Sequence, residues 1–167
     1  RGTVLLTTGF YVAGYAETDG PLGTVAVAEA LNHLGFHSVV VTDKYCKGFF
    51  ELKQLDVEYV DIAADEQVYE DILDKYHPVY MISIERCGEN AEHEYANMRG
   101  VSITSETAAI DHLFELAPEK HIPTIGVGDG GNEIGMGNVK DIISEKLELN
   151  PCVVPVDDLI IATTSNW

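Results

Sequence analysis

Six short apolar runs recur along the chain and constrain its fold more than any other feature. Most of them are continuous and rich in β-branched residues rather than alternating, which is typical of strands that are covered on both faces. The predicted strands cover residues 3–8, 37–42, 57–63, 79–84, 122–127 and 158–163.

Helical patterns fill the segments between these runs. The clearest covers residues 21–35, where Pro21 suits the first turn and Gly35 suits the stop. Two more helices are predicted over residues 65–76 and 105–117, the second opening with a capping signature. Strands alternating with helices of about 10 to 15 residues indicate βαβ units. We therefore expect an α/β fold with a doubly wound, mostly parallel sheet, a Rossmann-like three-layer sandwich.

The length of 167 residues corresponds to one domain. The chain starts without Met and stops directly after the last apolar run, so we expect a single α/β domain over residues 1–167 that belongs to a longer chain.

The chain is strongly acidic, with 10 basic and 28 acidic residues and a formal net charge of -18. Such a field repels phosphate backbones and anionic lipids, so nucleic-acid and membrane-surface partners are not expected. Three cysteines without CxxC spacing favour a reducing compartment. With no signal-peptide pattern and no apolar run of about 20 residues, a cytoplasmic location is expected.

In doubly wound sheets, ligands bind beyond the carboxyl ends of the strands. Four loops are therefore candidates for the site: residues 9–20, 85–105, 128–138, and the segment after Thr163.

The first loop places Thr18, Asp19 and Gly20 directly before the helix predicted at Pro21. A helix N-terminus presents backbone N–H groups and favours an anion. The alternative interpretation is that Thr18 or Asp19 only caps the helix.

The second loop begins with Glu85 and Arg86 and continues to Asn97 and Arg99. A guanidinium at the end of a strand can hold a carboxylate with two hydrogen bonds. A surface ion pair without function is the alternative.

The third loop is glycine-rich: six glycines stand in residues 126–137, which read GVGDGGNEIGMG. The GxGxxG match is weak evidence for a dinucleotide, because it comes late in the sheet and carries two acids. A nest of backbone amides with Asp129, Asn132 and Glu133 over a small polar substrate or a metal is the preferred interpretation.

Five carboxylates are expected to meet at one end of the sheet: Glu17, Asp19, Glu85, Asp129 and Glu133. Such crowding raises the proton affinity of a carboxylate or recruits a divalent cation, for which Asp19, Glu85 and Asp129 are candidate ligands. The six histidines lack HExxH or similar ligand spacing. No cofactor is required by these patterns, and a divalent metal ion stays open. Cys87, beside Arg86, is either an activated thiol or a small residue in a turn, and the second is favoured.

Taken together, the three loops resemble the C-terminal-type catalytic domain of the D-glutamate cyclase family. The resemblance covers about residues 7–167 and is carried by residues 17–23 (ETDGPLG), 85–86 (ER), 97–100 (NMRG) and 122–137 (IPTIGVGDGGNEIGMG). It implies a lyase that converts D-glutamate into 5-oxo-D-proline and water, located in the cytoplasm or, in a eukaryote, in the mitochondrial matrix.

That reaction requires a neutral amine, an electrophilic γ-carboxyl group and an oxygen that leaves as water. Backbone amides of the glycine loop and of the helix at Pro21 would stabilise the oxyanion. Our hypothesis assigns each remaining task to a pair of candidates: binding of the α-carboxylate to Arg86 or Arg99, removal of the ammonium proton to Asp129 or Glu133, and protonation of the leaving oxygen to Asp19 or Glu85.

The candidate catalytic residues are thus Asp19, Glu85, Asp129 and Glu133. The candidate substrate-binding residues are Thr18, Gly20, Arg86, Asn97, Arg99, Gly128, Gly130, Gly131 and Asn132. The expected partner is a small amino-acid substrate, and a homo-oligomer stays open. The alternative function is a non-catalytic α/β module that senses an amino acid or a nucleotide.

Overall fold

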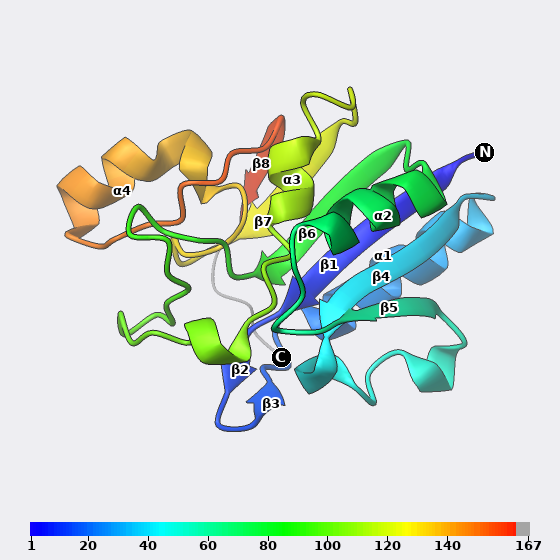
Figure 1. Cartoon of the computed structure of the whole chain (residues 1–167), viewed down its shortest axis with the longest axis horizontal. Coiled ribbons are helices and arrows are strands. Elements are labelled where there is room, and N and C mark those ends of the chain that lie inside the picture. Colours follow the sequence, from blue (N-terminus) through cyan, green and yellow to red (C-terminus); the bar gives the residue numbers. More distant parts are fainter. Residues whose placement is uncertain (163–167) are drawn as a thin grey trace.

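A six-stranded parallel sheet in the order β5-β4-β1-β6-β7-β8 runs through the computed structural model, which describes residues 1–162 (Figure 1). The strands are β1 (Thr3–Gly9), β4 (His37–Asp43), β5 (Asp56–Val60), β6 (Tyr80–Arg86), β7 (Thr124–Gly128) and β8 (Asp158–Ile161). The predicted doubly wound parallel sheet is confirmed. Thr163 and the candidate loop after it lie outside the described residues.

Helices cover both faces of the sheet. In Figure 1, α2 (Gln67–Tyr76) and α3 (His112–Leu116) lie in front of the strands and α1 (Pro21–His33) lies behind them. Successive strand residues point to opposite faces, so Leu5 belongs to the core cluster on the α2 side and Leu6 to the cluster on the α1 side. Burying each such leucine contributes about 1.5–3 kcal/mol.

The order of the strands reverses at β1, because β4 and β5 lie on one side of it and β6, β7 and β8 on the other. Gly9 of β1 pairs with Arg86 of β6, and Ile84 of β6 pairs with Val127 of β7. The carboxyl ends of these strands therefore meet at one edge, at the switch point where doubly wound proteins bind ligands.

The helix predicted over residues 105–117 is only partly correct. The α-helix is limited to α3 and follows a 3₁₀ turn at Thr104–Glu106. Between them, Ala108 and Ile110 are fully buried, and the carbonyl of Ala108 accepts a hydrogen bond from the Arg86 guanidinium. Tertiary contacts of this kind override a local helical pattern.

A short hairpin and a fourth helix were not expected from the sequence. Strands β2 (Tyr11–Val12) and β3 (Tyr15–Ala16) pair across Ala13 and Gly14, whose φ angles are 49° and 96°. Turns of this kind are usually signalled by Asn-Gly or Asp-Gly, so Ala-Gly was a weak signal. The remaining elements are α4 (Lys140–Leu147) and 3₁₀ turns at Lys44–Cys46, Glu51–Lys53 and Met136–Val139.

The strand expected over residues 57–63 ends earlier, at Val60. Residues 61–64 form a turn instead, in which the Asp61 side chain accepts the Ala63 N–H and the Asp61 carbonyl accepts the Ala64 N–H. Among residues 1–162, no helix is long and apolar enough to cross a membrane.

Candidate active site

A cavity of about 470 Å³ lies at the carboxyl edge of the sheet. Its lining comes from the end of β6 and from the three loops that follow β1, β6 and β7. The lining residues are Phe10, Tyr11, Val12, Glu17, Asp19, Glu85, Asn97, Met98, Arg99, Asp129, Asn132 and Glu133. The predicted convergence of five carboxylates is therefore confirmed.

The loop before α1 turns Asp19 toward the cavity. The N-cap of α1 is Gly20, and no side chain caps this helix, so the capping interpretation of Thr18 and Asp19 is wrong. Thr18 is exposed and is not among the lining residues, in contrast to its expected role in substrate binding.

Gly20 contributes by having no side chain. Its φ angle is 94°, and a Cβ atom there would lie 2.7 Å from Cβ of Glu85 and 2.6 Å from Oγ1 of Thr8. The glycine thus lets the start of α1 approach the end of β6 closely, which brings Asp19 next to Glu85.

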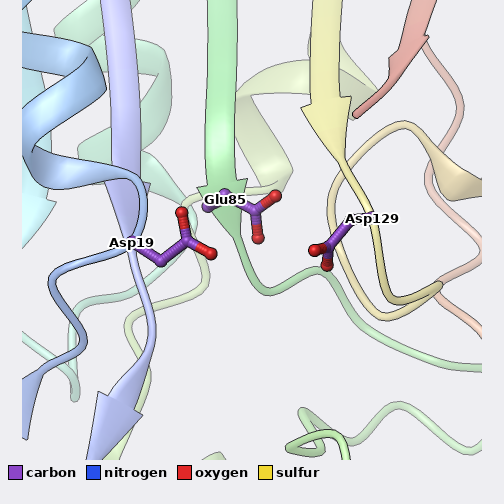
Figure 2. Close-up of side chains that lie close together, drawn as sticks. All are labelled: Asp19, Glu85 and Asp129. Atoms are coloured by element: carbon purple, nitrogen blue, oxygen red, sulfur yellow. The ribbon is translucent and has the colours of Figure 1, made fainter. Parts of the chain in front are cut away.

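Glu85 lies between two other acids of the site, Asp19 and Asp129 (Figure 2). Figure 2 shows it at the tip of β6, with Asp19 on one side and Asp129 on the other, and each of the three residues offers a carboxylate oxygen within 4.8 Å of the others. Its φ angle of 50° is left-handed, a conformation that costs a non-glycine residue about 1–3 kcal/mol and is frequent at functional sites.

The surroundings of Glu85 change its ionisation. Burial, followed by the negative charges of Glu133, Asp129 and Asp19, raises its pKa to about 9. Burial also raises the pKa of Asp129, with Glu133 and Asp19 adding to the effect, and burial and Asp19 raise the pKa of Glu17. At neutral pH Glu85 is therefore a neutral carboxyl group that can donate a proton.

The structure corrects the expected role of Arg86. Its guanidinium is not in the cavity lining but in the core, where Nη1 lies 2.7 Å from Oδ2 of Asp43 and the residue is only 1 % exposed. It also donates to the carbonyls of Gly9 and Ala108. Arg86 therefore ties together the ends of β1, β4 and β6 instead of holding a substrate carboxylate.

The glycine-rich loop does form a nest of amides, but Glu133 fills it. The Glu133 carboxylate accepts hydrogen bonds from the backbone N–H groups of Asp129, Gly130 and Gly131 at 3.0, 2.6 and 2.7 Å. A Cβ atom on Gly128 would lie 2.8 Å from three carbon atoms of the Glu133 side chain. In contrast to the expectation that they bind the substrate or its oxyanion, these three amides are occupied by Glu133, which is placed to fix the loop.

The turn that carries Asn97 and Arg99 closes one side of the cavity. Oδ1 of Asn97 accepts the N–H groups of Arg99 and Val101 at 2.9 and 3.0 Å, so this side chain shapes the turn. Nδ2 of Asn132 donates to the carbonyl of Ala96 at 2.8 Å and links the glycine-rich loop to the turn. Among the described residues that line the cavity, Arg99 provides the one cationic side chain.

The apolar wall of the cavity was missed in the sequence. It consists of Phe10, Tyr11, Val12 and Met98, of which Val12 is 49 % and Met98 75 % exposed. The run of apolar side chains directly after the first strand was the available signal, because it continues into a loop at the carboxyl end of the sheet, where Val12 stays exposed.

Asp19, Glu85 and Asp129 fit a hard divalent cation, since Mg²⁺ and Ca²⁺ prefer carboxylate oxygens.

The three cysteines are free and buried, and burial raises the pKa of Cys87 to about 12. Cys87 is therefore the small buried residue that was favoured, and not an activated thiol.

Fold and cavity together define a Rossmann-like α/β protein with an acidic pocket at the switch point of its sheet. The family described as D-glutamate cyclase-like, C-terminal, matches residues 1–167, and the chain belongs to this family.

Human mitochondrial D-glutamate cyclase is 33 % identical over 192 aligned residues, which cover 99 % of this chain and 31 % of the human protein. The chain thus spans about a third of the length of this curated relative. Among solved structures, MurG of Acinetobacter baumannii matches all of this chain and 46 % of its own, with a TM-score of 0.56 and 10 % identity. At that identity the likeness concerns the fold alone.

Proposed function

We propose that this domain catalyses the intramolecular dehydration of D-glutamate to 5-oxo-D-proline, as a carbon–oxygen lyase. One observation carries the proposal: Glu85 stands between two further carboxylates in a cavity whose rim carries Arg99, and burial and these neighbours raise its pKa to about 9. Membership of the D-glutamate cyclase-like family and the likeness to the human cyclase support it.

The reaction forms a bond between the α-nitrogen and the δ-carbon, which is the carbon of the γ-carboxyl group, and breaks one of the carbon–oxygen bonds of that carboxyl group. Two protons leave the nitrogen and two join the departing oxygen, so the site needs a base and an acid. Asp129 is the proposed base, because Glu133 is held by three backbone amides. Glu85 is the proposed acid, because its raised pKa of about 9 keeps the carboxyl group protonated at neutral pH.

The second proton has a short way to travel. Oxygens of Asp129, Glu85 and Asp19 lie within 4.8 Å of one another, a separation that one bridging water spans, so a water can pass the proton from Asp129 to Glu85 during the same turnover. Pairs of carboxyl groups whose pKa values are pushed apart by their surroundings are a recurring way of dividing acid and base roles.

Arg99 is the proposed partner of the substrate α-carboxylate, since Arg86 is occupied by Asp43. The N-terminus of α1, which begins at Pro21 directly beyond Asp19 and Gly20, is the proposed source of positive potential for the oxyanion. No organic cofactor is proposed. As an alternative to the acid role of Glu85, a divalent cation held by Asp19, Glu85 and Asp129 would displace the Glu85 proton and polarise the γ-carboxyl group itself.

The test is incubation of the purified protein with D-glutamate, followed by chiral chromatography for 5-oxo-D-proline, with L-glutamate as the stereochemical control. Arms with Mg²⁺, Mn²⁺ and a chelator establish whether a cation is needed. Glu85→Gln is compared with Glu119→Gln, an exposed acid outside the cavity. We expect product with the parent and with Glu119→Gln, and a loss of about 100-fold or more with Glu85→Gln.

Calorimetric binding of D-glutamate without product in any metal arm would contradict the enzyme proposal and favour an amino-acid-sensing module. Sensing of a nucleotide is less compatible with the cavity, because Glu133 already occupies the amides that would hold a phosphate.

We propose a cytoplasmic or mitochondrial-matrix location and no nucleic-acid or membrane partner, in line with the net charge of -18.

A further inference from the structure

A buried carboxylate outside the cavity is not used by the proposed reaction. Asp111, directly before α3, is 2 % exposed. Its Oδ1 accepts a hydrogen bond from the hydroxyl of Tyr95 at 2.6 Å, and its Oδ2 accepts the backbone N–H of Glu89 at 2.9 Å. One side chain thus holds two points of the loop that follows β6.

Tyr95 is the base of the turn that carries Arg99. The carbonyl of Tyr95 accepts the N–H of Ile103 at 2.8 Å, and its N–H donates to Oγ1 of Thr104 at 3.0 Å. Beyond this point Ala96 pairs with Ser102, and the tip at residues 97–100 reaches the cavity. The place of the tip therefore depends on where Tyr95 is anchored.

The ring of Tyr95 packs in a small cluster with Phe10, Cys87 and Ile103, separate from the two cores of the sheet. Apolar packing alone is non-directional, whereas the hydrogen bond to a charged acceptor fixes the hydroxyl end of the ring. Asp111 in turn is the N-cap residue of α3, whose Leu113 and Phe114 belong to the core cluster on that face of the sheet.

We propose that Asp111 and Tyr95 are positioning residues: the Asp111 carboxylate, through the Tyr95 hydroxyl, fixes the turn of residues 95–103 so that Arg99 faces the cavity. This inference rests on the proposed function only where it concerns binding of the substrate carboxylate by Arg99. The anchoring of the turn is independent of any reaction.

The ionisation of Asp111 makes the link testable. Burial raises the pKa of Asp111 to about 6, while the hydrogen bonds from Tyr95 and Glu89 lower it and the charges of Glu115 and Glu89 raise it. Burial and Asp111 raise the pKa of Tyr95, so the phenol stays protonated. The titratable groups that interact electrostatically with Asp111 are Tyr69, Glu89, Tyr95, Glu115, Cys87 and Cys152. The positive charge of Arg86 lowers the pKa values of three of them, Tyr69, Tyr95 and Cys87.

The two hydrogen bonds that Asp111 accepts depend on its ionisation, and therefore on pH. Above a pH of about 6 the ionised Asp111 accepts both hydrogen bonds, and below it the carboxyl group carries a proton that competes for the same oxygens. Removing the Tyr95 hydroxyl takes away a hydrogen bond that favours the carboxylate, so it shifts the titration of Asp111 to higher pH.

The test compares Tyr95→Phe with a matched control, Tyr76→Phe. Tyr76 is the last residue of α2, and its hydroxyl donates a hydrogen bond to the Glu58 carboxylate, so the control also removes a tyrosine–carboxylate hydrogen bond. The first readout is hydrogen-exchange protection of the turn amides of Asn97 and Ile103. We expect about 10-fold lower protection in Tyr95→Phe, and no change in Tyr76→Phe.

The second readout is the pH dependence of KM for D-glutamate. We expect KM of the parent to rise as the pH falls through about 6, with kcat changing less than about 3-fold. Tyr95→Phe should raise KM about 10-fold and move this rise to higher pH, and Asp111→Asn should remove the rise. If Tyr95→Phe does not fold, Asp111→Asn decides through the exchange readout.

Parental protection of the turn in Tyr95→Phe would overturn the proposal, and so would a lower melting temperature with an unchanged pH profile of KM. Absence of product from every variant would instead refute the proposed function. The exchange readout would then still decide whether Asp111 anchors the turn.

Discussion

At the scale of single residues, the two arginines near the site have opposite environments. Arg86 is 1 % exposed and paired with Asp43, whereas Arg99 is exposed on the turn that closes the cavity. A buried charge whose partner is removed is strongly destabilising, while a charge on an exposed turn contributes little to stability. Structural and ligand-binding roles are therefore separable by matched substitutions.

Arg86→Gln should destabilise the fold by about 3–5 kcal/mol, because it leaves the buried carboxylate of Asp43 without its cation. Arg99→Gln should change the free energy of unfolding by less than about 0.5 kcal/mol and raise KM for D-glutamate about 10-fold or more. Urea unfolding and initial-rate kinetics measure both effects. An Arg99→Gln enzyme with parental KM would remove Arg99 from substrate binding.

Glu85 also makes stability depend on pH. Its pKa is raised from the ordinary 4.5 to about 9, so between these values the folded protein holds a proton that the unfolded chain releases. Because the folded state binds more protons in this window, its stability falls as the pH rises through it.

Glu85→Gln should therefore stabilise the protein at pH 8, by about 1–2 kcal/mol once the partial exposure of the side chain is allowed for. The dependence of Tm on pH between about 6 and 9 should also become flatter than in the parent. Thermal unfolding across this range, with Glu119→Gln as the control, measures both. Equal slopes in Glu85→Gln and the parent would show that Glu85 titrates normally.

At the scale of elements, the glycine-rich loop after β7 is fixed by its own acid. Glu133 is 2 % exposed and accepts three backbone N–H groups, so the loop is closed on an internal anion. Gly128 is needed because the Glu133 side chain lies where a Cβ atom would be. The loop therefore holds Asp129 at the cavity without using its amides on a ligand.

Gly128→Ala should destabilise the protein by about 1–3 kcal/mol, because the added methyl group would lie 2.8 Å from a side chain that is itself held by hydrogen bonds. Gly23→Ala is the matched control, since a Cβ atom at this position in α1 meets nothing within 4 Å. It should stabilise the helix by about 0.5–1 kcal/mol. Urea unfolding of the two variants measures both, and equal effects would contradict the role of Glu133.

The elements that could be predicted are those with a strong local pattern. All six strands of the parallel sheet were found, because continuous β-branched runs are typical of buried parallel strands. The helix predicted at residues 105–117 was only partly correct, because residues 107–111 are held by the core and by Arg86. Local patterns do not include such contacts.

The site residues also divide into those that a local sequence signal marks and those whose role depends on tertiary contacts. Asp19, Glu85 and Asp129 were found because each follows a predicted strand or precedes a helix, so topology alone brings them together. The partner of Arg86 is 43 residues away in the sequence, and no local signal marks Asp43 as its counterion. Only the tertiary structure shows which of the two arginines is free to reach the cavity.

At the scale of the whole molecule, the net charge of -18 opposes the compact state. Ten basic side chains cannot pair with 28 acids, so most of the surplus repels itself across the surface. The cavity has the same imbalance on a small scale, which adds to the effect of burial in raising the pKa of Glu85.

Salt should stabilise this protein. Between about 10 mM and 150 mM NaCl the screening length falls from about 30 Å to about 8 Å, which weakens repulsion across a domain of this size. We expect Tm at pH 8 to rise by several degrees over this range. The rise should vanish near the sequence pI of 4.4, where net charge is small, and an equal rise at that pH would rule out charge repulsion as its cause.

The central claim is that the acidic cavity is an active site in which Glu85 acts as a protonated acid. Its most direct test is the pH profile of kcat/KM for the formation of 5-oxo-D-proline from D-glutamate. We predict activity that falls above a pH of about 9 in the parent and in Glu119→Gln, and a loss of about 100-fold or more in Glu85→Gln. Parental turnover by Glu85→Gln, with the same profile, would contradict the account.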